Sequence, residues 1–370
     1  MIKKSHDKNV YLTAGFLSLF LLAGIFSGNY DQFGILKGEH FLTKSLYYKG
    51  GFRGGVRLVQ SLPDKKIAIC GQMGGIILDS KTRALKTSVK FQIQRGVLNP
   101  EIVDFKKDGA FKIMLRGGGF GDVGLLDHNG NVIWIYKPDN PIRPNKKELL
   151  SEMNAGDLDR NGELEFYVAT IHNGIHKLDY NGKKIWEIGV GKLGEAEGRL
   201  RGDVEVYNPA EKETPLIVVR CYNGRIQFRN CDGQLVREIK PEIKIGRLQL
   251  INWPSPGHIL TKSGNSIYVL DFNGKTIFKY TPIYGFNRFY GIAVKLSDEQ
   301  NPYLVVITAS KSRTFRQLLS IFSPDGELVY QEVLKGSPAL CAIKSDSLKS
   351  EYLLVGEGCD KVWEYRLNTK

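Results

Sequence analysis

Short runs of alternating apolar and polar residues recur along the chain, and many are joined in pairs by an Asn-Gly or Asp-Gly turn. The clearest copies begin at Leu126 (Leu-Asp-His-Asn-Gly-Asn-Val-Ile-Trp), Leu178 (Leu-Asp-Tyr-Asn-Gly-Lys-Lys-Ile-Trp) and Leu270 (Leu-Asp-Phe-Asn-Gly-Lys-Thr-Ile-Phe), and weaker copies begin at Phe228 and Phe322. A period of two is typical of a β-strand with one buried face, and such turns close antiparallel hairpins. Because helical periodicity is almost absent after residue 50, the pattern predicts an all-β fold.

The hairpins recur at a nearly constant interval. The turn glycines are Gly130, Gly182, Gly233, Gly274 and Gly326, so successive turns are 52, 51, 41 and 52 residues apart. Two further strand-like runs lie upstream of each hairpin, for example 154–159 and 164–170 before Leu178. Four short antiparallel strands per repeat form one blade of a β-propeller. We count six complete blades, which start near residues 53, 99, 152, 202, 247 and 289.

A seventh blade is incomplete at the C-terminus. The chain supplies three strands, Ala339–Lys344, Tyr352–Gly356 and Val362–Leu367, and the sequence ends soon after them. The stretch Gly38–Tyr48 is predicted to donate the fourth strand, since joining the two ends of the chain removes an exposed sheet edge. The sequence therefore predicts a seven-bladed β-propeller over residues 53–370, closed by an N-terminal strand.

The N-terminal region has a different pattern. Residues 9–30 form a run of 22 residues without a charge, and a helix of that length spans about 33 Å, enough to cross a hydrocarbon core of about 30 Å. Lysines within residues 1–8 precede the run, so the positive-inside rule predicts a cytoplasmic tail and an extracytoplasmic body, periplasmic or extracellular. We expect an uncleaved transmembrane signal-anchor, followed by a linker and closing strand at 31–52. A cleaved signal peptide is the alternative, and it also exports the body.

Charge and cysteine content narrow the classes of partner. The chain has 52 Lys plus Arg and 39 Asp plus Glu, a formal net charge of +13, which suits an anionic partner. Because the body is predicted to be exported, nucleic acid is not expected as a partner.

The cysteines form no CxxC pair, which argues against a zinc ribbon or a thioredoxin-type site. They are expected to be thiols rather than a disulfide scaffold. They are Cys70, Cys221, Cys231, Cys341 and Cys359.

Two motifs resemble known repeat families. The Leu-Asp-x-Asn-Gly-x-x-x-Trp copies, with Trp134 and Trp186, resemble the repeats of bacterial PQQ-type propellers, in which a tryptophan docks between blades. That resemblance covers most of residues 75–335. Gly-Asp-Leu-Asp-Arg-Asn-Gly-Glu-Leu-Glu, from Gly156, resembles a single FG-GAP or VCBS-type repeat. Together they imply an exported propeller. True quinoproteins usually have a Thr-Gly turn and eight blades, so bound PQQ is not expected.

The loop after Gly156 predicts a calcium site. It places carboxylates and an amide at positions 1, 3 and 5, a glycine at the bend, a carbonyl at position 7 and a carboxylate at position 9, an arrangement of the oxygen ligands that Ca²⁺ prefers. The predicted ligands are Asp157, Asp159, Asn161, Glu163 (through its carbonyl) and Glu165. The resemblance to FG-GAP repeats implies a structural ion. An acidic turn that binds nothing is the alternative, and the related loop from Asp104, with Lys106 at position 3, is expected to be metal-free.

A set of arginines lies shortly before, or inside, the predicted innermost strands. These are Arg53, Arg57, Arg95, Arg199, Arg201, Arg247 and Arg288. In a propeller such positions surround one mouth of the central channel. Guanidinium groups that converge there favour an anionic ligand such as a carboxylate, a phosphate or an acidic glycan. The alternative is that they are solvated loop charges.

No motif of a known catalytic class is present: there is no GxSxG, HExxH or Walker loop. His172 and His176 flank an Asn-Gly turn on opposite arms, which disfavours a zinc pair. We therefore expect a non-catalytic, membrane-anchored module that binds an envelope protein or an anionic polymer. The alternative is a central-channel enzyme, lyase or sulfotransferase-like, that acts on an anionic substrate.

Overall fold

The structure, a computed structural model, describes residues 35–52, 55–62, 64–71, 73–91, 100–103, 111–116, 123–138, 150–172, 174–189, 203–209, 213–221, 223–283, 285–297, 301–310, 316–335, 339–344, 351–358 and 361–368. The predicted membrane anchor at 9–30 lies outside these ranges. Every regular element within them is a β-strand, and none of the described residues belongs to a helix of the length and apolarity that a membrane span needs.

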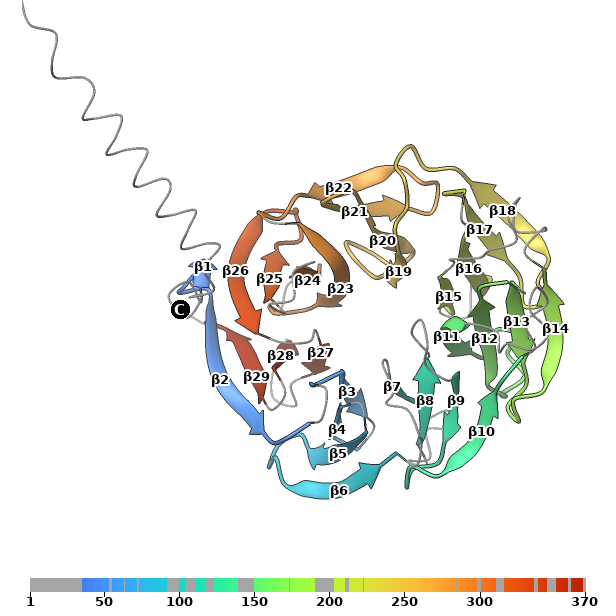
Figure 1. Cartoon of the computed structure of the whole chain (residues 1–370). Helices are drawn as coiled ribbons and strands as arrows, with labels where there is room; N and C mark the ends of the chain where they lie inside the picture. The colour runs from blue at the N-terminus through green and yellow to red at the C-terminus, as the bar shows by residue number, and fades with distance from the viewer. Residues whose placement is uncertain are drawn as a thin grey trace, which may run out of the picture.

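Seven antiparallel sheets form a ring, in which each blade runs from a strand near the axis to a strand on the rim (Figure 1). Blade 1 is β3 (Leu58–Leu62), β4 (Lys66–Cys70), β5 (Gly74–Asp79) and β6 (Leu85–Lys90). Blade 2 is β7 (Pro100–Val103), β8 (Lys112–Arg116), β9 (Val123–Leu126) and β10 (Val132–Tyr136). Blade 3 is β11 (Leu150–Gly156), β12 (Glu165–Thr170), β13 (Ile175–Leu178) and β14 (Lys184–Ile188).

The remaining blades continue the ring. Blade 4 is β15 (Val204–Tyr207), β16 (Leu216–Arg220), β17 (Ile226–Arg229) and β18 (Leu235–Ile239). Blade 5 is β19 (Leu248–Ile251), β20 (His258–Ser263), β21 (Ser266–Asp271) and β22 (Thr276–Tyr280). Blade 6 is β23 (Phe286–Val294), β24 (Tyr303–Ser310), β25 (Arg316–Phe322) and β26 (Leu328–Lys335). Blade 7 is β27 (Ala339–Lys344), β28 (Glu351–Glu357), β29 (Lys361–Leu367) and β2 (Leu42–Lys49). The seven-bladed propeller predicted from the repeat is confirmed, and each of the six complete blades begins within a few residues of its predicted start.

In blades 2 to 6 the glycine of the outer hairpin turn lies against the blade before it. Gly182 has φ = 79°, and a Cβ there would lie 2.6 Å from the Trp134 ring of blade 2. The Trp134 indole Nε1 donates a hydrogen bond to the Tyr180 carbonyl of the same turn at 3.0 Å. Trp186 donates in the same way to the Cys231 carbonyl of blade 4, at 3.2 Å. The tryptophan docking implied by the PQQ-type repeats is therefore present between blades 2, 3 and 4.

The N-terminal strand closes the ring, as the sequence predicts. Strand β2 pairs antiparallel with β29, with Leu42 opposite Leu367. The turn that is continuous in other blades is divided here between the two ends of the chain, because the Asn368 backbone N–H donates to the Phe41 carbonyl at 3.1 Å. The Asn368 side-chain amide also donates to the His40 carbonyl at 2.7 Å. The chain ends thus replace a hairpin turn.

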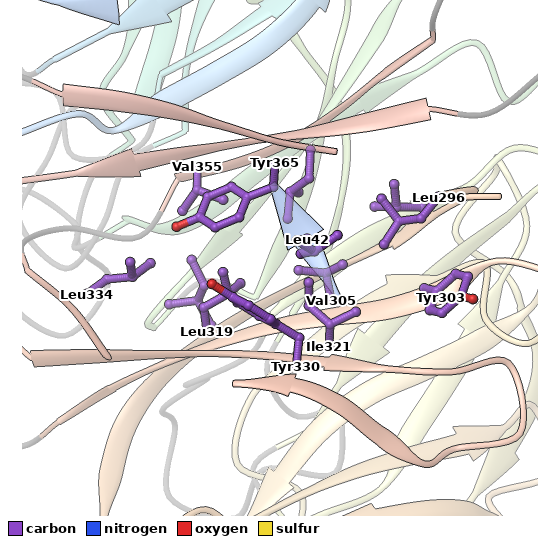
Figure 2. Close-up of a cluster of buried hydrophobic side chains, with 13 residues drawn as sticks. Leu42, Leu296, Tyr303, Val305, Leu319, Ile321, Tyr330, Leu334, Val355 and Tyr365 are labelled. Atoms are coloured by element: carbon purple, nitrogen blue, oxygen red, sulfur yellow. The ribbon is translucent and has the colours of Figure 1, made fainter. Parts of the chain in front are cut away.

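A further N-terminal strand was not predicted. Strand β1 (Ile35–Lys37) adds to the outer edge of blade 6 by pairing antiparallel with β26, which gives that blade five strands. The seam between blades 6 and 7 is apolar: Leu42 lies among side chains of both blades, including Val305, Tyr330 and Tyr365 (Figure 2). The N-terminal segment therefore contributes to both of the last two blades.

Candidate binding surface at the mouth of the ring

The innermost strands all run in the same direction, because each blade is a four-strand meander that starts near the axis (Figure 1). Their first residues therefore lie on one face, which we call the mouth of the ring. Of the predicted arginines, Arg57 directly precedes β3, Arg247 directly precedes β19, and Arg288 lies near the start of β23. These three belong to blades 1, 5 and 6. The other four predicted arginines lie outside the described residues; they are Arg53, Arg95, Arg199 and Arg201.

A carboxylate that the sequence analysis did not single out faces Arg247. The guanidinium Nη2 lies 3.5 Å from Glu152 Oε1, and Glu152, on β11, is only 6% exposed. The pair links blade 3 to blade 5 across blade 4. Glu152 balances the positive charge of Arg247 within the ring. Because the arginine side chain is 40% exposed, this charge also remains accessible to a partner.

A second ion pair lies on blade 4, beside the first. Asp203 directly precedes β15, and its Oδ2 accepts a hydrogen bond from Arg220 Nε at 3.0 Å. The same oxygen accepts the backbone N–H of Leu248, on the first strand of blade 5, at 2.7 Å. A buried carboxylate bonded in this way fixes the spacing of adjacent innermost strands, since losing the bonds would leave a charge without compensation.

The polar lining continues along these strands. Asn154 Nδ2 of β11 donates to Glu205 Oε2 of β15 at 2.8 Å. The described mouth at blades 3 to 5 therefore carries both signs of charge, where the sequence predicted arginines. Glu152 and Asn154 are two residues apart, as are Asp203 and Glu205, and this alternation is the signal that could have identified them. Their pairing across blades depends on the ring and is invisible in one strand.

The predicted calcium loop adopts a compact acidic turn. Asp157 Oδ2 accepts the Gly162 N–H at 3.2 Å, Asp159 Oδ1 accepts the Asn161 N–H at 3.1 Å, and Asn161 Oδ1 in turn accepts the N–H of Glu163 at 2.6 Å. The other Asp157 oxygen, Oδ1, is buried and has no hydrogen-bond partner among the described residues. That unpaired oxygen fits a cation ligand.

Position 9 of the loop does not fit as well. Glu165 is buried, pairs with Lys177 and accepts a hydrogen bond from Tyr167 Oη at 2.7 Å. Burial raises the pKa of Glu165, while Lys177 and Tyr167 lower it. Its carboxylate is thus already engaged inside the blade. Among the described residues, no group of three or more His, Cys, Asp or Glu side chains is arranged to hold a metal, so the loop would depend on Asp157, Asp159, Asn161 and backbone oxygens.

The two histidines have separate environments. His176 is 1% exposed, its Nδ1 shares a hydrogen bond of 2.6 Å with Tyr136 Oη of blade 2, and burial lowers its pKa to about 4. His172 lies half-buried at the turn that follows β12. His176 is therefore a neutral group inside the interface of blades 2 and 3, away from the mouth.

Comparison with solved structures identifies the fold. BBS1N in complex with ARL6DN has a TM-score of 0.60 at 11% identity, over 91% of this chain and 98% of that one. Streptogramin B lyase has a TM-score of 0.61 at 12% identity, over 90% and 100%. Raptor from Chaetomium thermophilum has a TM-score of 0.58 at 13% identity, over 93% of this chain and 30% of that one. No protein-family model and no curated protein sequence matches the chain.

Proposed function

We propose that the protein is a membrane-anchored, extracytoplasmic β-propeller that binds an envelope protein through the mouth of the ring. The anchor is supported by the uncharged run at residues 9–30, with lysines on its N-terminal side. The closing strand begins at Leu42, so only a short stretch separates the anchor from the ring. This arrangement holds the propeller close to the membrane surface.

The mixed charge of the mouth carries the proposal. A small anion is bound best by convergent donors that lack internal partners, whereas Arg247 is paired with Glu152 and Arg220 with Asp203. Alternating charges of both signs suit a protein surface with complementary charges, because they select the partner and its orientation. We therefore favour an envelope protein over an anionic polymer. BBS1N, which has the same fold, was solved in complex with a protein.

The alternative is a central-channel enzyme, a lyase or sulfotransferase-like protein that acts on an anionic substrate. The structural similarity to streptogramin B lyase supports this alternative, because that protein has the same fold and is a lyase. Fold alone does not choose between binding and catalysis. An enzyme of this kind requires a general acid or base beside the substrate. Glu152, which lies next to Arg247 at the mouth, is a candidate for that role.

In-cell cross-linking tests the binding function. The full-length protein should capture one envelope protein, identified by mass spectrometry and confirmed by reciprocal capture. Arg288→Glu, which reverses an exposed charge at the mouth, should abolish that capture. Lys275→Glu, a matched reversal in a turn on the opposite face, should leave it intact. Capture that is equal in all three proteins would overturn the proposal, and retention of an acidic polysaccharide in place of a protein would favour the anionic-ligand alternative.

A further inference from the structure

The rim of the ring shows two kinds of strand edge. In blade 6, the outer strand β26 is covered by β1, and its residues Tyr330, Gln331 and Glu332 are buried. In blades 1 to 5, within the part of the chain that the structure describes, the outer strand is the last of its sheet, and each of these strands exposes at least one aliphatic side chain. The chain itself therefore shows that an outer edge of this ring accepts an added strand.

Strand β6 of blade 1 lies on the rim of the ring (Figure 1), and it has more exposed residues than the outer strands of blades 2 to 5. Five of its six residues are exposed, and Leu85 is 62% exposed. Val89 is the exception, because it packs against Gly130 of blade 2. The strand contains neither Pro nor Gly, which hinder pairing, and it includes the β-branched residues Thr87 and Val89, which favour it.

The hydrogen-bonding direction of β6 follows from its neighbour. The Phe91 N–H donates to the Met73 carbonyl at 2.9 Å, toward the inside of the blade. Because successive residues of a strand point their N–H groups to opposite sides, Val89 also faces inward, and Ser88 and Lys90 face the open edge. Ser88 therefore presents its N–H and carbonyl to a further strand. Lys90 presents its N–H alone, because its carbonyl oxygen lies against the turn of blade 2, where a Cβ on Gly130 would be 2.3 Å away.

Charge determines which strand fits. Lys86 and Lys90 lie two residues to either side of Ser88. Lys86 lies where the register with β5 shifts, and its Nζ pairs with Asp79 Oδ2 at 3.8 Å, but its side chain is 50% exposed and remains accessible to a partner. A second copy of β6, paired antiparallel about Ser88, would place Lys86 opposite Lys90, and like charges directly opposite are destabilising. Self-association is thereby disfavoured. Acidic residues are favoured beside these lysines on an added strand, and aliphatic residues on its other face, beside Thr87.

We propose that the outer edge of blade 1 is a strand-addition site for an extended segment of a partner protein that alternates acidic and aliphatic residues. Main-chain hydrogen bonds to Ser88 and to the Lys90 N–H provide affinity, and the lysines select the acidic positions. The site lies on the rim, whereas the binding surface described above lies at the mouth. The two surfaces are independent, and a partner can occupy one without the other.

Selection from a display library of short random peptides tests the site, with the purified full-length protein as bait. Enriched peptides should alternate Asp or Glu with Val, Ile or Leu. The best of them, made synthetically and measured by fluorescence anisotropy, should bind Ser88→Pro about tenfold more weakly or worse, because proline removes the outward N–H without breaking the β5–β6 ladder. Ser88→Ala, which keeps that N–H, should bind like the unmodified protein.

Two controls complete the test. Ser88→Pro should melt close to the unmodified protein; if it does not fold, the double variant Lys86→Glu/Lys90→Glu decides, and it should prefer peptides with Lys in place of Glu. Arg288→Glu at the mouth should leave peptide binding unchanged, which separates this site from the proposed function. Enrichment of peptides without acidic alternation, or equal binding by Ser88→Pro, would overturn the proposal. So would the absence of any peptide that prefers the unmodified protein over the edge variants.

Discussion

Blade 3 and the seam between blades 6 and 7 contain the same buried chemistry, but they assemble it from different parts of the chain. In blade 3, Tyr167 donates to Glu165 at 2.7 Å and Lys177 pairs with the same carboxylate. All three residues lie on β12 and β13, which are consecutive strands joined by a short turn. The group therefore joins two consecutive strands of one blade, and Lys177 Nζ also donates to the Cys231 carbonyl in the turn of blade 4 at 3.4 Å.

At the seam, Glu332 of β26 takes the place of the blade 3 glutamate. It accepts hydrogen bonds from Tyr330 at 2.7 Å and Tyr365 at 2.8 Å, and it pairs with Lys44 of β2 at 2.6 Å. Lys44 and Glu332 are 288 residues apart in sequence. The same three residue types thus join strands that are neighbours in sequence in one region, and strands from the two ends of the chain in the other.

Removal of the closing segment should have the largest effect. Deleting residues 35–49 removes β1 and β2, exposes the edges of β29 and β26, and uncovers Tyr330 and Tyr365. Exposed apolar strand edges promote aggregation. We expect the variant to aggregate or to lose its cooperative unfolding transition, as measured by size-exclusion chromatography and thermal melting.

A smaller change isolates the role of β2. Replacing only β1 (Ile35–Lys37) with a Gly-Ser linker of equal length keeps β2 in place, so this control should remain monomeric and melt cooperatively. A deletion of 35–49 that is monomeric and melts like the parent would show that the N-terminal stretch is only a linker.

The buried Lys177 and the partly exposed Lys44 should differ in their contribution to stability. Lys177→Met leaves Glu165 buried without its cation, which should lower the free energy of unfolding by about 3–5 kcal/mol. The Lys44 side chain is 22% exposed, so water partly replaces it, and Lys44→Met should cost about 1 kcal/mol. Urea denaturation of both variants measures the difference. Equal losses would mean that both groups stabilise the fold in the same way.

The packing of the turn glycine Gly182 against Trp134 should have the next largest effect on stability. In Gly182→Ala the new Cβ would meet the Trp134 ring at 2.6 Å, and strain plus positive φ should cost about 2–3 kcal/mol. Gly162→Ala is the matched control: its φ is 86°, but a Cβ meets no atom within 4 Å, so about 1 kcal/mol is expected from backbone strain alone. Thermal melting compares the two, and similar shifts would argue against turn docking.

Calcium should have the smallest effect. Binding to the folded state at ten times Kd stabilises by about 1.4 kcal/mol, so calcium should raise the melting temperature and chelator should lower it. Asp157→Ala or Asp159→Ala should abolish the response, whereas Asp104→Ala should preserve it. Mg²⁺ should substitute poorly, since it demands a smaller octahedral shell. If calcium does not shift the melting temperature of the unmodified protein, the loop is an acidic turn that binds no calcium.

Local sequence signals predicted most of the fold. The turns at Gly130, Gly182 and Gly274 marked the blades because they need a positive φ that glycine adopts freely. The missing fourth strand of blade 7 pointed to the N-terminal segment as its replacement. Strand β1 was missed because its three residues are exposed, and an exposed strand of that length has no alternating pattern.

The candidate site was less predictable. Arg247 was identified from its position before an innermost strand, but its partner Glu152 comes from two blades away. Glu165 was assigned to calcium from its spacing, and the structure adds its pairing with Lys177, a residue of the next strand that a loop motif does not include. Contacts between strands and blades decide charge pairing, and they depend on the closed ring.

The membrane topology of the chain is the most direct test of a membrane-anchored extracytoplasmic propeller. A specific protease site inserted between residues 30 and 35 separates the proposed anchor from the ring. Protease added outside intact cells, or to spheroplasts if an outer membrane is present, should release the ring from the membrane fraction into solution and leave a small N-terminal fragment in the membrane. A ring that is released only after the cytoplasmic membrane is lysed, or a soluble protein that already begins near residue 29, would contradict a membrane-anchored extracytoplasmic propeller.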